Sequence, residues 1–513
     1  MRLIVLAALG AAALGFPVRA QTSPAGGADH PGCRSITARQ CVARAIEAMG
    51  GATALRSISS ARLDVAAHTL LTEQSYRQAP FITAYDRIQM SVDFRNGVVG
   101  QTVHDLWPES DPDTASAEST TTMVATPLAA VVRSEPTDAP GSRAQMDEAA
   151  VALELGPERL LLSADGAPDL AFAPSETLRS TLHSVVSFTW RGRRLKVLIN
   201  AANHLPDGFE TTRSFNDFWV AWGDVRQRVY FDDWKLIGGI VYPTNRIDER
   251  NGVLWRSTQV LDAKFNLPLD GAATAMDPVA AAKSSAGLGW RRAFDDRRHV
   301  ALDPGIDLFV GSWNVTLVRQ DAGVLVLEAP ISPTFTKGVL AKARANPEHL
   351  PLSGVLSTSD SWPHAAGVRQ AVAEQLPVYV LDLNRPLLDR MAKAPHTERP
   401  DDLQARPHPA IWKVVSGKTE VGAGPNRVVL YPLRGAATER QYMVYFPERR
   451  LLYASDTIVI DADKQVLYDP ELAHEVVQAV AREHLQVDRV FAMHQAPVAW
   501  SEVVRLVAVA AAS

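Results

Sequence analysis

The chain has 513 residues, a formal net charge of −5, 46% hydrophobic residues and 21% charged residues. One hydrophobic core does not accommodate this length, so we expect two or three globular domains. No run of Lys and Arg is long enough to follow a phosphate backbone, which argues against nucleic acid as a partner.

The N-terminus has the pattern of a secretory signal peptide. Arg2 precedes an apolar run over residues 3–16, and small residues lead to Val18-Arg19-Ala20. This pattern predicts a signal peptide over residues 1–20 and a periplasmic or secreted protein. The apolar run is shorter than the about 20 residues that span a bilayer, so no stable membrane span is expected. An uncleaved anchor is the alternative.

The chain contains two cysteines, Cys33 and Cys41. An oxidising compartment favours a disulfide between them over two free thiols. No second cysteine pair is present to complete a zinc site. Cys41 falls in a predicted helix over residues 37–49, which Gly50-Gly51 ends, so residues 21–60 form a helical lead-in whose N-terminus the bridge would hold.

Residues 61–270 are predicted to form an antiparallel β-rich domain. Strand formers cluster over residues 195–199, 227–231 and 252–261, and turns are expected at Asp232-Asp233 and Gly238-Gly239. We assign the aromatic run 215–222 to the core of this domain. The pattern resembles the half-barrel sheet of periplasmic lipoprotein carriers, which implies a concave face able to hold an apolar ligand. A sheet that packs on helices and binds nothing is the alternative that we favour.

Residues 271–300, rich in Ala and Ser, are the predicted linker. From residue 301 to residue 513, strands and helices alternate. A strand ending near Leu356 is followed by a polar turn over residues 358–364 and a helix over residues 364–374. Such a turn places its side chains at the carboxyl end of a sheet, where α/β folds place their sites.

This turn resembles the first metal-binding turn of the metallo-β-lactamase superfamily, His-x-His-x-Asp-His. Ser359 and Ser361 occupy the first two His positions, Pro363 occupies the Asp position, and only His364 matches. Three other segments resemble that superfamily in the same order: residues 324–328, ending in Glu328; residues 451–456, ending in Asp456; and residues 490–494, ending in His494. The resemblance implies an αβ/βα sandwich, so we predict an α+β chain with an N-terminal β-rich domain and a C-terminal metallo-β-lactamase-like domain.

The resemblance also implies a reduced metal site. Ser359 and Ser361 are poor substitutes for imidazole on zinc, and residues 431–438, where a middle His is expected, contain none. His364, Asp456 and His494 remain. Two imidazoles and one carboxylate suffice for one catalytic Zn²⁺ with an open position, and the same set suits Fe(II). Structural roles for all three residues, in a helix cap, a buried imidazole and a turn, are the alternative.

If a metal binds, the expected activity is hydrolysis of an ester, lactam or phosphoryl compound of low molecular weight by an activated water. Asp360 is the candidate general base, because the superfamily's own acid in this turn is missing. Ser359, Ser361, Trp362 and Arg434 are candidate substrate-binding residues. We expect Glu439, Arg440, His396 and His408 to be solvated.

Two other functions are alternatives for this chain. A serine hydrolase built on Ser359 or Ser361 lacks the Gly-x-Ser-x-Gly elbow. A catalytically inactive binding protein of the cell envelope with the same fold is the rival hypothesis. The sequence predicts neither the substrate nor the oligomeric state.

Overall fold

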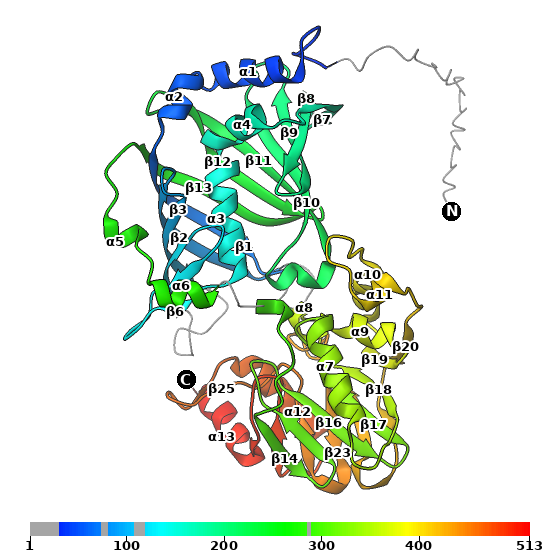
Figure 1. Cartoon of the computed structure of the whole chain (residues 1–513). Coiled ribbons are helices and arrows are strands. Elements are labelled where there is room, and N and C mark those ends of the chain that lie inside the picture. The colour runs from blue at the N-terminus through cyan, green and yellow to red at the C-terminus, as the bar shows by residue number, and fades with distance from the viewer. Residues whose placement is uncertain (1–29, 73–80, 107–117, 285–288, 513) are drawn as a thin grey trace, which may run out of the picture.

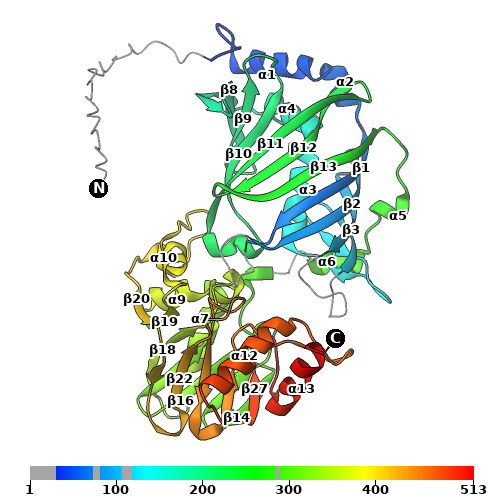
Figure 2. The ribbon, with the colours of Figure 1, turned by 180° about the vertical axis from the view of Figure 1, so that it is seen from behind.

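The computed structural model of the chain describes residues 30–72, 81–106, 118–284 and 289–512 (Figures 1 and 2). The predicted signal peptide, residues 1–20, lies outside this part of the chain. Within it, the prediction of a mixed α+β, sheet-rich fold is confirmed. Of the helices that the structure describes, none combines the length and the apolar character that crossing a membrane requires.

Residues 60–265 contain one antiparallel sheet of 13 strands. The first strand of this segment, β1, pairs with its last strand, β13, in the middle of the sheet, and the other strands extend outward on both sides. The strands are β1 (Ser60–Leu70), β2 (Thr83–Asp93), β3 (Val98–Leu106), β4 (Glu118–Ala125), β5 (Ala130–Val132), β6 (Ala139–Pro140), β7 (Ala171–Leu178), β8 (Thr181–Trp190), β9 (Arg193–Asn200), β10 (Pro206–Ser214), β11 (Asp224–Ile237), β12 (Ile240–Arg250) and β13 (Val253–Phe265).

The hairpin between β11 and β12 confirms one predicted turn and corrects another. Gly238 and Gly239 both have positive φ, 59° and 85°, as a tight hairpin turn requires. The turn predicted at Asp232-Asp233 is wrong, because β11 continues through both residues. Asp232 lies opposite Asn245 and Trp234 opposite Pro243 in one unbroken register, so pairing with β12 overrides the local turn preference.

Four helices accompany this sheet: α1 (Ala38–Ala48), α2 (Ala52–Ser57), α3 (Arg143–Leu155) and α4 (Pro157–Gly166). Figures 1 and 2 show the sheet curving around α3 and α4. Apolar side chains of α1, α3 and α4 join those of β8 to β12 in one buried cluster, which includes Leu155, Leu160, Phe188 and Phe231. The sheet therefore has a concave, helix-covered face. Its likeness to lipoprotein carriers stays a prediction.

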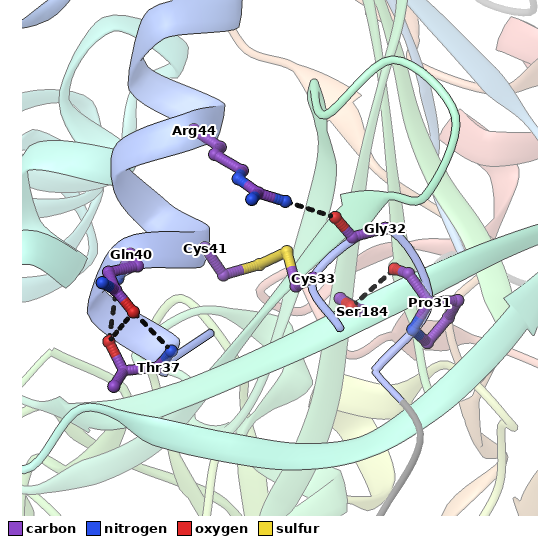
Figure 3. Close-up of a disulfide and its surroundings, with 8 residues drawn as sticks. All are labelled: Pro31, Gly32, Cys33, Thr37, Gln40, Cys41, Arg44 and Ser184. Carbon is purple, nitrogen blue, oxygen red and sulfur yellow. Dashed lines mark hydrogen bonds between the residues drawn. A yellow bond between two sulfur atoms is a disulfide. The ribbon is translucent and has the colours of Figure 1, made fainter. Parts of the chain in front are cut away.

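Cys33 and Cys41 are joined by a disulfide at the start of this unit (Figure 3). Their Cα atoms are 5.5 Å apart and both side chains are buried. Thr37 caps α1, because its hydroxyl accepts from the Gln40 backbone N–H while the Gln40 side chain accepts from the Thr37 backbone N–H. Ser184 of β8 donates a 2.7 Å hydrogen bond to the Pro31 carbonyl. The bridge thus holds residues 30–36 against both α1 and β8.

Short helices α5 (Gly271–Thr274), α6 (Pro278–Ser284) and η2 (Gly289–Arg291) occupy the predicted linker. Two further large sheets follow. The 7-stranded sheet contains β14 (His299–Asp303), β15 (Ile306–Phe309), β16 (Val315–Gln320), β17 (Gly323–Leu327), β18 (Leu352–Ser357), β19 (Pro377–Leu381) and β20 (Ile411–Val415). The 6-stranded sheet contains β21 (Thr419–Val421), β22 (Val428–Pro432), β23 (Tyr442–Phe446), β24 (Leu451–Tyr453), β27 (Arg489–Phe491) and β28 (Val498–Ala499).

The helices of this half are α7 (Pro333–Arg344), α8 (Trp362–Ala365), α9 (Val368–Ala373), α10 (Arg385–Lys393), α11 (Asp402–Ala405), α12 (Pro470–Arg482) and α13 (Trp500–Ala510). One apolar cluster lies between the two sheets and includes Leu325, Leu356 and Phe446. A second cluster joins the 7-stranded sheet to α7, α9 and α10, and a third joins the 6-stranded sheet to α12 and α13. The layers are therefore helix, sheet, sheet and helix.

The aromatic run of the first half contacts the second half. Trp219 and Trp222, in η1 (Phe218–Trp222), pack edge-on against Trp362, with ring centroids 4.8 and 5.2 Å apart. Phe215, Trp219 and Val225 belong to the same buried cluster as α7 and α9. Our assignment of residues 215–222 to the core of the β-rich half is therefore corrected, because this run packs between the halves. The division into domains at residues 271–300 stays a prediction.

Candidate metal centre

The candidate site lies where four strands of the sandwich end. β17 and β18 are parallel neighbours in one sheet, and β24 and β27 are parallel neighbours in the other. Their carboxyl ends therefore lie at one edge of each sheet. Glu328 follows β17, the turn 358–364 follows β18, Asp456 follows β24, and His494 follows β27. Segments more than 100 residues apart in sequence meet at this edge.

His364, Asp456 and His494 come together at this edge, with one ligand atom of each within 4.8 Å of the others. The two Nε2 atoms of His364 and His494 are 3.3 Å apart. One oxygen of Asp456 lies 3.4 Å from His364 Nε2, and its other oxygen lies 3.4 Å from His494 Nε2. Ligands of a tetrahedral zinc ion, each about 2.0–2.1 Å from the metal, lie about 3.3–3.4 Å from one another. The spacing of the three side chains fits a single ion.

The protonation states of the two imidazoles also fit. His494 Nδ1 lies 2.5 Å from the Ser312 carbonyl oxygen, which only accepts, so Nδ1 carries the proton and Nε2 keeps a lone pair. Burial lowers the pKa of His364 well below its usual value, with His494 adding to the shift, and burial also lowers the pKa of His494. Both rings are therefore neutral at pH 7, which is the form that ligates metals.

Asp456 has no cation beside it among the described residues, where its ion-pair partners are the two imidazoles. Burial raises its pKa to about 8, and the charge of Asp469 adds to the shift. The Asp456 backbone N–H donates to Gln441 Oε1 at 2.9 Å, which fixes the start of its loop. The site opens toward Asp456 and His494, whose side chains are 21% and 28% exposed, whereas that of His364 is 3% exposed.

A buried carboxyl group ties two of the strand ends together. Glu328 accepts a hydrogen bond from the Thr358 hydroxyl and another, 3.1 Å long, from the Tyr453 hydroxyl. The Thr358 hydroxyl also lies 2.7 Å from that of Ser455. Burial raises the pKa of Glu328 to about 8 in spite of these hydrogen bonds. Glu328 and Ser455 have positive φ, 78° and 57°, a backbone strain that is common beside functional sites.

The remaining predicted residues of the turn are buried beside the three candidate ligands. Ser359 Oγ accepts from the Ser361 backbone N–H at 3.2 Å, and Trp362 forms the contact with η1. Asp360 is fully buried and its carboxylate lies 3.7 Å from Arg440 Nε, outside the group of three. The turn therefore places Asp360 near the site but not in the candidate ligand set.

The charged loop before β23 is arranged differently from our expectation. Arg434 donates to both carboxylate oxygens of Asp382, at 2.8 and 2.9 Å, so its guanidinium is already paired. Arg440, which we expected to be solvated, is half-buried and is the residue that faces Asp360. Arg440 and Asp360 are 80 residues apart, and such a pairing leaves no local pattern in the sequence. The sequence therefore does not indicate that Arg440, and not Arg434, faces Asp360.

Several residues near the site are not predicted by the sequence, or are predicted in a different role. Gln441 accepts from the Asp456 backbone N–H, and the Ser312 carbonyl accepts from His494 Nδ1. No sequence pattern around Gln441 or Ser312 predicts these contacts. Trp313 contacts the His494 ring, with centroids 5.7 Å apart. Trp219 and Trp222 were visible as an aromatic run, yet their position beside Trp362 depends on how the two halves meet.

His396 corrects a further expectation. It is buried, 6% exposed, and its Nδ1 lies 3.4 Å from Asp401 Oδ2. Burial lowers its pKa to about 4, and the nearby Arg369 guanidinium adds to the shift. Its place against Gly223 follows from tertiary packing that the Pro-rich loop around it does not indicate. His408 is half-buried.

No protein-family model matches this sequence, and no curated protein matches it. Solved structures do. The DIM-1 metallo-β-lactamase is 16% identical, with a TM-score of 0.33 over 42% of this chain and 97% of that one. A metallo-β-lactamase from Pontibacter korlensis is 12% identical, with a TM-score of 0.33 over 42% and 99%. The stereoselective inverting sec-alkylsulfatase Pisa1 from Pseudomonas sp. is 11% identical, with a TM-score of 0.30 over 41% and 40%. Identities and TM-scores are low, so the case for a metal centre depends on the geometry of His364, Asp456 and His494.

Proposed function

We propose that this chain is an exported, metal-dependent hydrolase of metallo-β-lactamase fold that acts on a small molecule. One observation carries the proposal: three neutral or acidic ligand groups face one another at 3.3–3.4 Å, with no Lys or Arg paired to them among the described residues. Buried polar groups ordinarily have hydrogen-bond or charge partners, so an uncompensated group of this shape is best explained by a bound cation.

His364, Asp456 and His494 would hold one Zn²⁺ ion, and the same donors suit Fe(II). When bound, such an ion with an open position lowers the pKa of water toward neutrality and polarises the electrophilic oxygen of a substrate. Ser359, Ser361 and Pro363 supply no ligand for a second ion, which favours a mononuclear site.

The residues around the three candidate ligands have proposed roles in substrate binding, proton transfer and support of the turn. Asp360 is the candidate general base, and its pairing with Arg440 fixes its position at the start of α8. Arg440 takes over from Arg434 as the candidate cation for an anionic substrate group, because its Nε lies 3.7 Å from Asp360, whereas Arg434 donates closer hydrogen bonds to both oxygens of Asp382. Trp362, with Trp219 and Trp222 behind it, forms an apolar wall beside His364. Glu328, protonated below about pH 8, keeps the turn 358–364 against the Ser455 loop.

Export is part of the proposal. The pattern of residues 1–20 supports it, and so does the disulfide between Cys33 and Cys41, since such bonds persist in oxidising compartments. The rival function is a catalytically inactive binding protein of the cell envelope. The substitution of the family's other ligand positions by Ser359, Ser361 and Pro363 is the observation that favours this rival.

Hydrolysis assays on the purified full chain test the proposal. We expect at least one of a set of chromogenic esters, lactams, phosphate esters and sulfate esters to be hydrolysed. The activity should disappear with a chelator, return with Zn²⁺ or Fe²⁺, and be lost in His364→Ala and Asp456→Asn. His396→Ala is the matched control, because it removes a buried imidazole of a second His–Asp pair. Metal binding without hydrolysis of any substrate would favour the binding protein instead.

A further inference from the structure

A cavity of about 580 Å³ lies inside the β-rich half, away from the candidate metal centre. It is bounded by α3 and the start of α4 on one side and by β1 to β4, β12 and β13 on the other. Figures 1 and 2 show these elements as the concave face of the sheet and the helices that it curves around. Its volume is within the about 300–1,000 Å³ that is usual for sites of small ligands.

Most of the cavity wall is apolar. Side chains from several strands converge on it, among them Leu63, Val65, Ile88, Met90, Val99 and Val260. A wall of this composition favours hydrocarbon over a polar ligand.

Three carboxylates of the wall lie beside arginines. Asp86 forms an ion pair with Arg256, and Asp248 lies 3.4 Å from Arg246. Glu148 forms an ion pair of 3.1 Å with Arg213 behind the wall. In each of these three pairs the arginine offsets the charge of the carboxylate.

The carboxyl of Glu158 is also buried in this wall. It is 5% exposed, it lines the cavity, and it forms no ion pair with another described residue. Its Oε2 atom is buried without a hydrogen-bond partner among the described residues, whereas Oε1 lies over Gly156 at the start of α4. Burial raises the pKa of Glu158 to about 7, and the charges of Arg159 and Arg246 offset only part of this shift. A cation that enters the cavity therefore meets a buried carboxyl oxygen that has no hydrogen-bond partner among the described residues.

We propose that this cavity binds an amphiphilic amine, with one hydrocarbon chain against the apolar wall and the protonated amine against Glu158. The apolar wall accounts for the chain, and the buried Glu158 Oε2, which has no hydrogen-bond partner among the described residues, accounts for the head group. This site is separate from the proposed hydrolase, because none of the cavity-lining residues belongs to the segment 301–513.

Titration calorimetry on the full chain with dodecylamine, dodecanol and dodecanoate tests the inference. Each compound is used below its micelle concentration and with a chelator present, so that amine–metal contacts do not contribute. Glu158→Gln keeps the shape of the side chain and removes its charge. Val260→Trp fills the cavity. Asp262→Asn is the control, since Asp262 lies on β13 and is exposed.

We expect saturable 1:1 binding of dodecylamine, at least tenfold tighter than that of dodecanoate. Glu158→Gln should weaken dodecylamine at least tenfold and leave dodecanol within twofold, while Asp262→Asn should change neither. Val260→Trp, if it folds, should weaken both. The inference is overturned if none of the three compounds binds saturably, if dodecanoate binds as tightly as dodecylamine, or if Glu158→Gln weakens all three alike. His364→Ala should retain dodecylamine binding, so the test of this cavity does not depend on whether the proposed metal centre exists.

Discussion

Two histidine–aspartate pairs are buried in the second half of the molecule, and they differ in one partner. His396 Nδ1 and Asp401 Oδ2 are 3.4 Å apart, as are His364 Nε2 and Asp456 Oδ2. Beside Asp401, Arg369 makes a two-pronged ion pair, with Nε and Nη2 at 2.6 and 3.0 Å from the carboxylate oxygens. Beside Asp456, the structure places a second imidazole instead of a guanidinium.

The pKa values of the two aspartates diverge accordingly. Burial raises the pKa of Asp401, but the Arg369 hydrogen bond and nearby charges leave it below its ordinary value. Burial raises the pKa of Asp456 to about 8, and nothing nearby lowers it. The comparison teaches that a buried His–Asp pair is not itself a site. The pair with its own cation is structural, and the pair without one is the candidate for an external cation.

The largest effect is expected from removing the internal cation. Arg369→Met leaves Asp401 buried without its guanidinium and frees three backbone carbonyls, those of Met391, Ala392 and Ala394. We expect a loss of about 3–5 kcal/mol in the free energy of unfolding, measured with denaturant. Arg434→Met, which breaks an exposed pair, should cost under about 1 kcal/mol. Equal losses in the two variants would remove the distinction between a buried and an exposed pair.

Added Zn²⁺ should stabilise the folded chain through the His364–Asp456 pair and not through the His396–Asp401 pair. Zn²⁺ at 100 times its dissociation constant should raise the free energy of unfolding by about 2.7 kcal/mol in the wild type and in His396→Ala. His364→Ala should show no such gain. Thermal unfolding with and without Zn²⁺ measures both quantities. An equal zinc-induced gain in His364→Ala would place the metal elsewhere.

Glu328 is a second carboxyl at the site that has no ion pair with another residue in the part of the chain that the structure describes, and it predicts a pH dependence of stability. Its pKa in the folded chain, about 8, lies above its ordinary 4.5. The folded state therefore keeps a proton that the unfolded chain has lost, so this stabilisation is complete below pH 4.5 and is lost as the pH rises to about 8. In metal-free protein, the free energy of unfolding should fall less steeply with rising pH in Glu328→Gln than in the wild type, by up to about 1.4 kcal/mol per pH unit. A wild type and a variant with the same slope would refute the assignment.

The smallest effect concerns zinc affinity and pH. Below about pH 8, zinc must displace the proton of Asp456, so the dissociation constant should fall by at most about tenfold per pH unit from pH 6 to pH 8 and level off above. Competition with a chromophoric chelator measures this. Asp456→Asn has no such proton, and the pKa values of both histidines are lowered, so its weaker binding should change little between pH 6 and pH 8. A flat profile in the wild type would contradict the raised pKa of Asp456.

The sequence predicts local features of this fold well and distant pairings poorly. The helix after Thr37, the strands over residues 195–199 and 227–231 and the turn at Gly238-Gly239 follow from a cap, clustered strand formers and glycine. The three candidate ligands were found because a family pattern places a polar residue at each strand end. Arg369 with Asp401, Arg440 with Asp360 and η1 with Trp362 join segments 32 to 143 residues apart. Such partners are chosen by tertiary packing, and no local period or cap reports them.

Metal content of the purified full chain, measured by atomic spectroscopy after Zn²⁺ loading and desalting, tests the central claim most directly. We predict one zinc ion per chain in the wild type and in His396→Ala, and none in His364→Ala or His494→Ala. A wild type without bound zinc or iron, or stoichiometric metal that persists in both of these last variants, would contradict the assignment of His364, Asp456 and His494 as a metal centre.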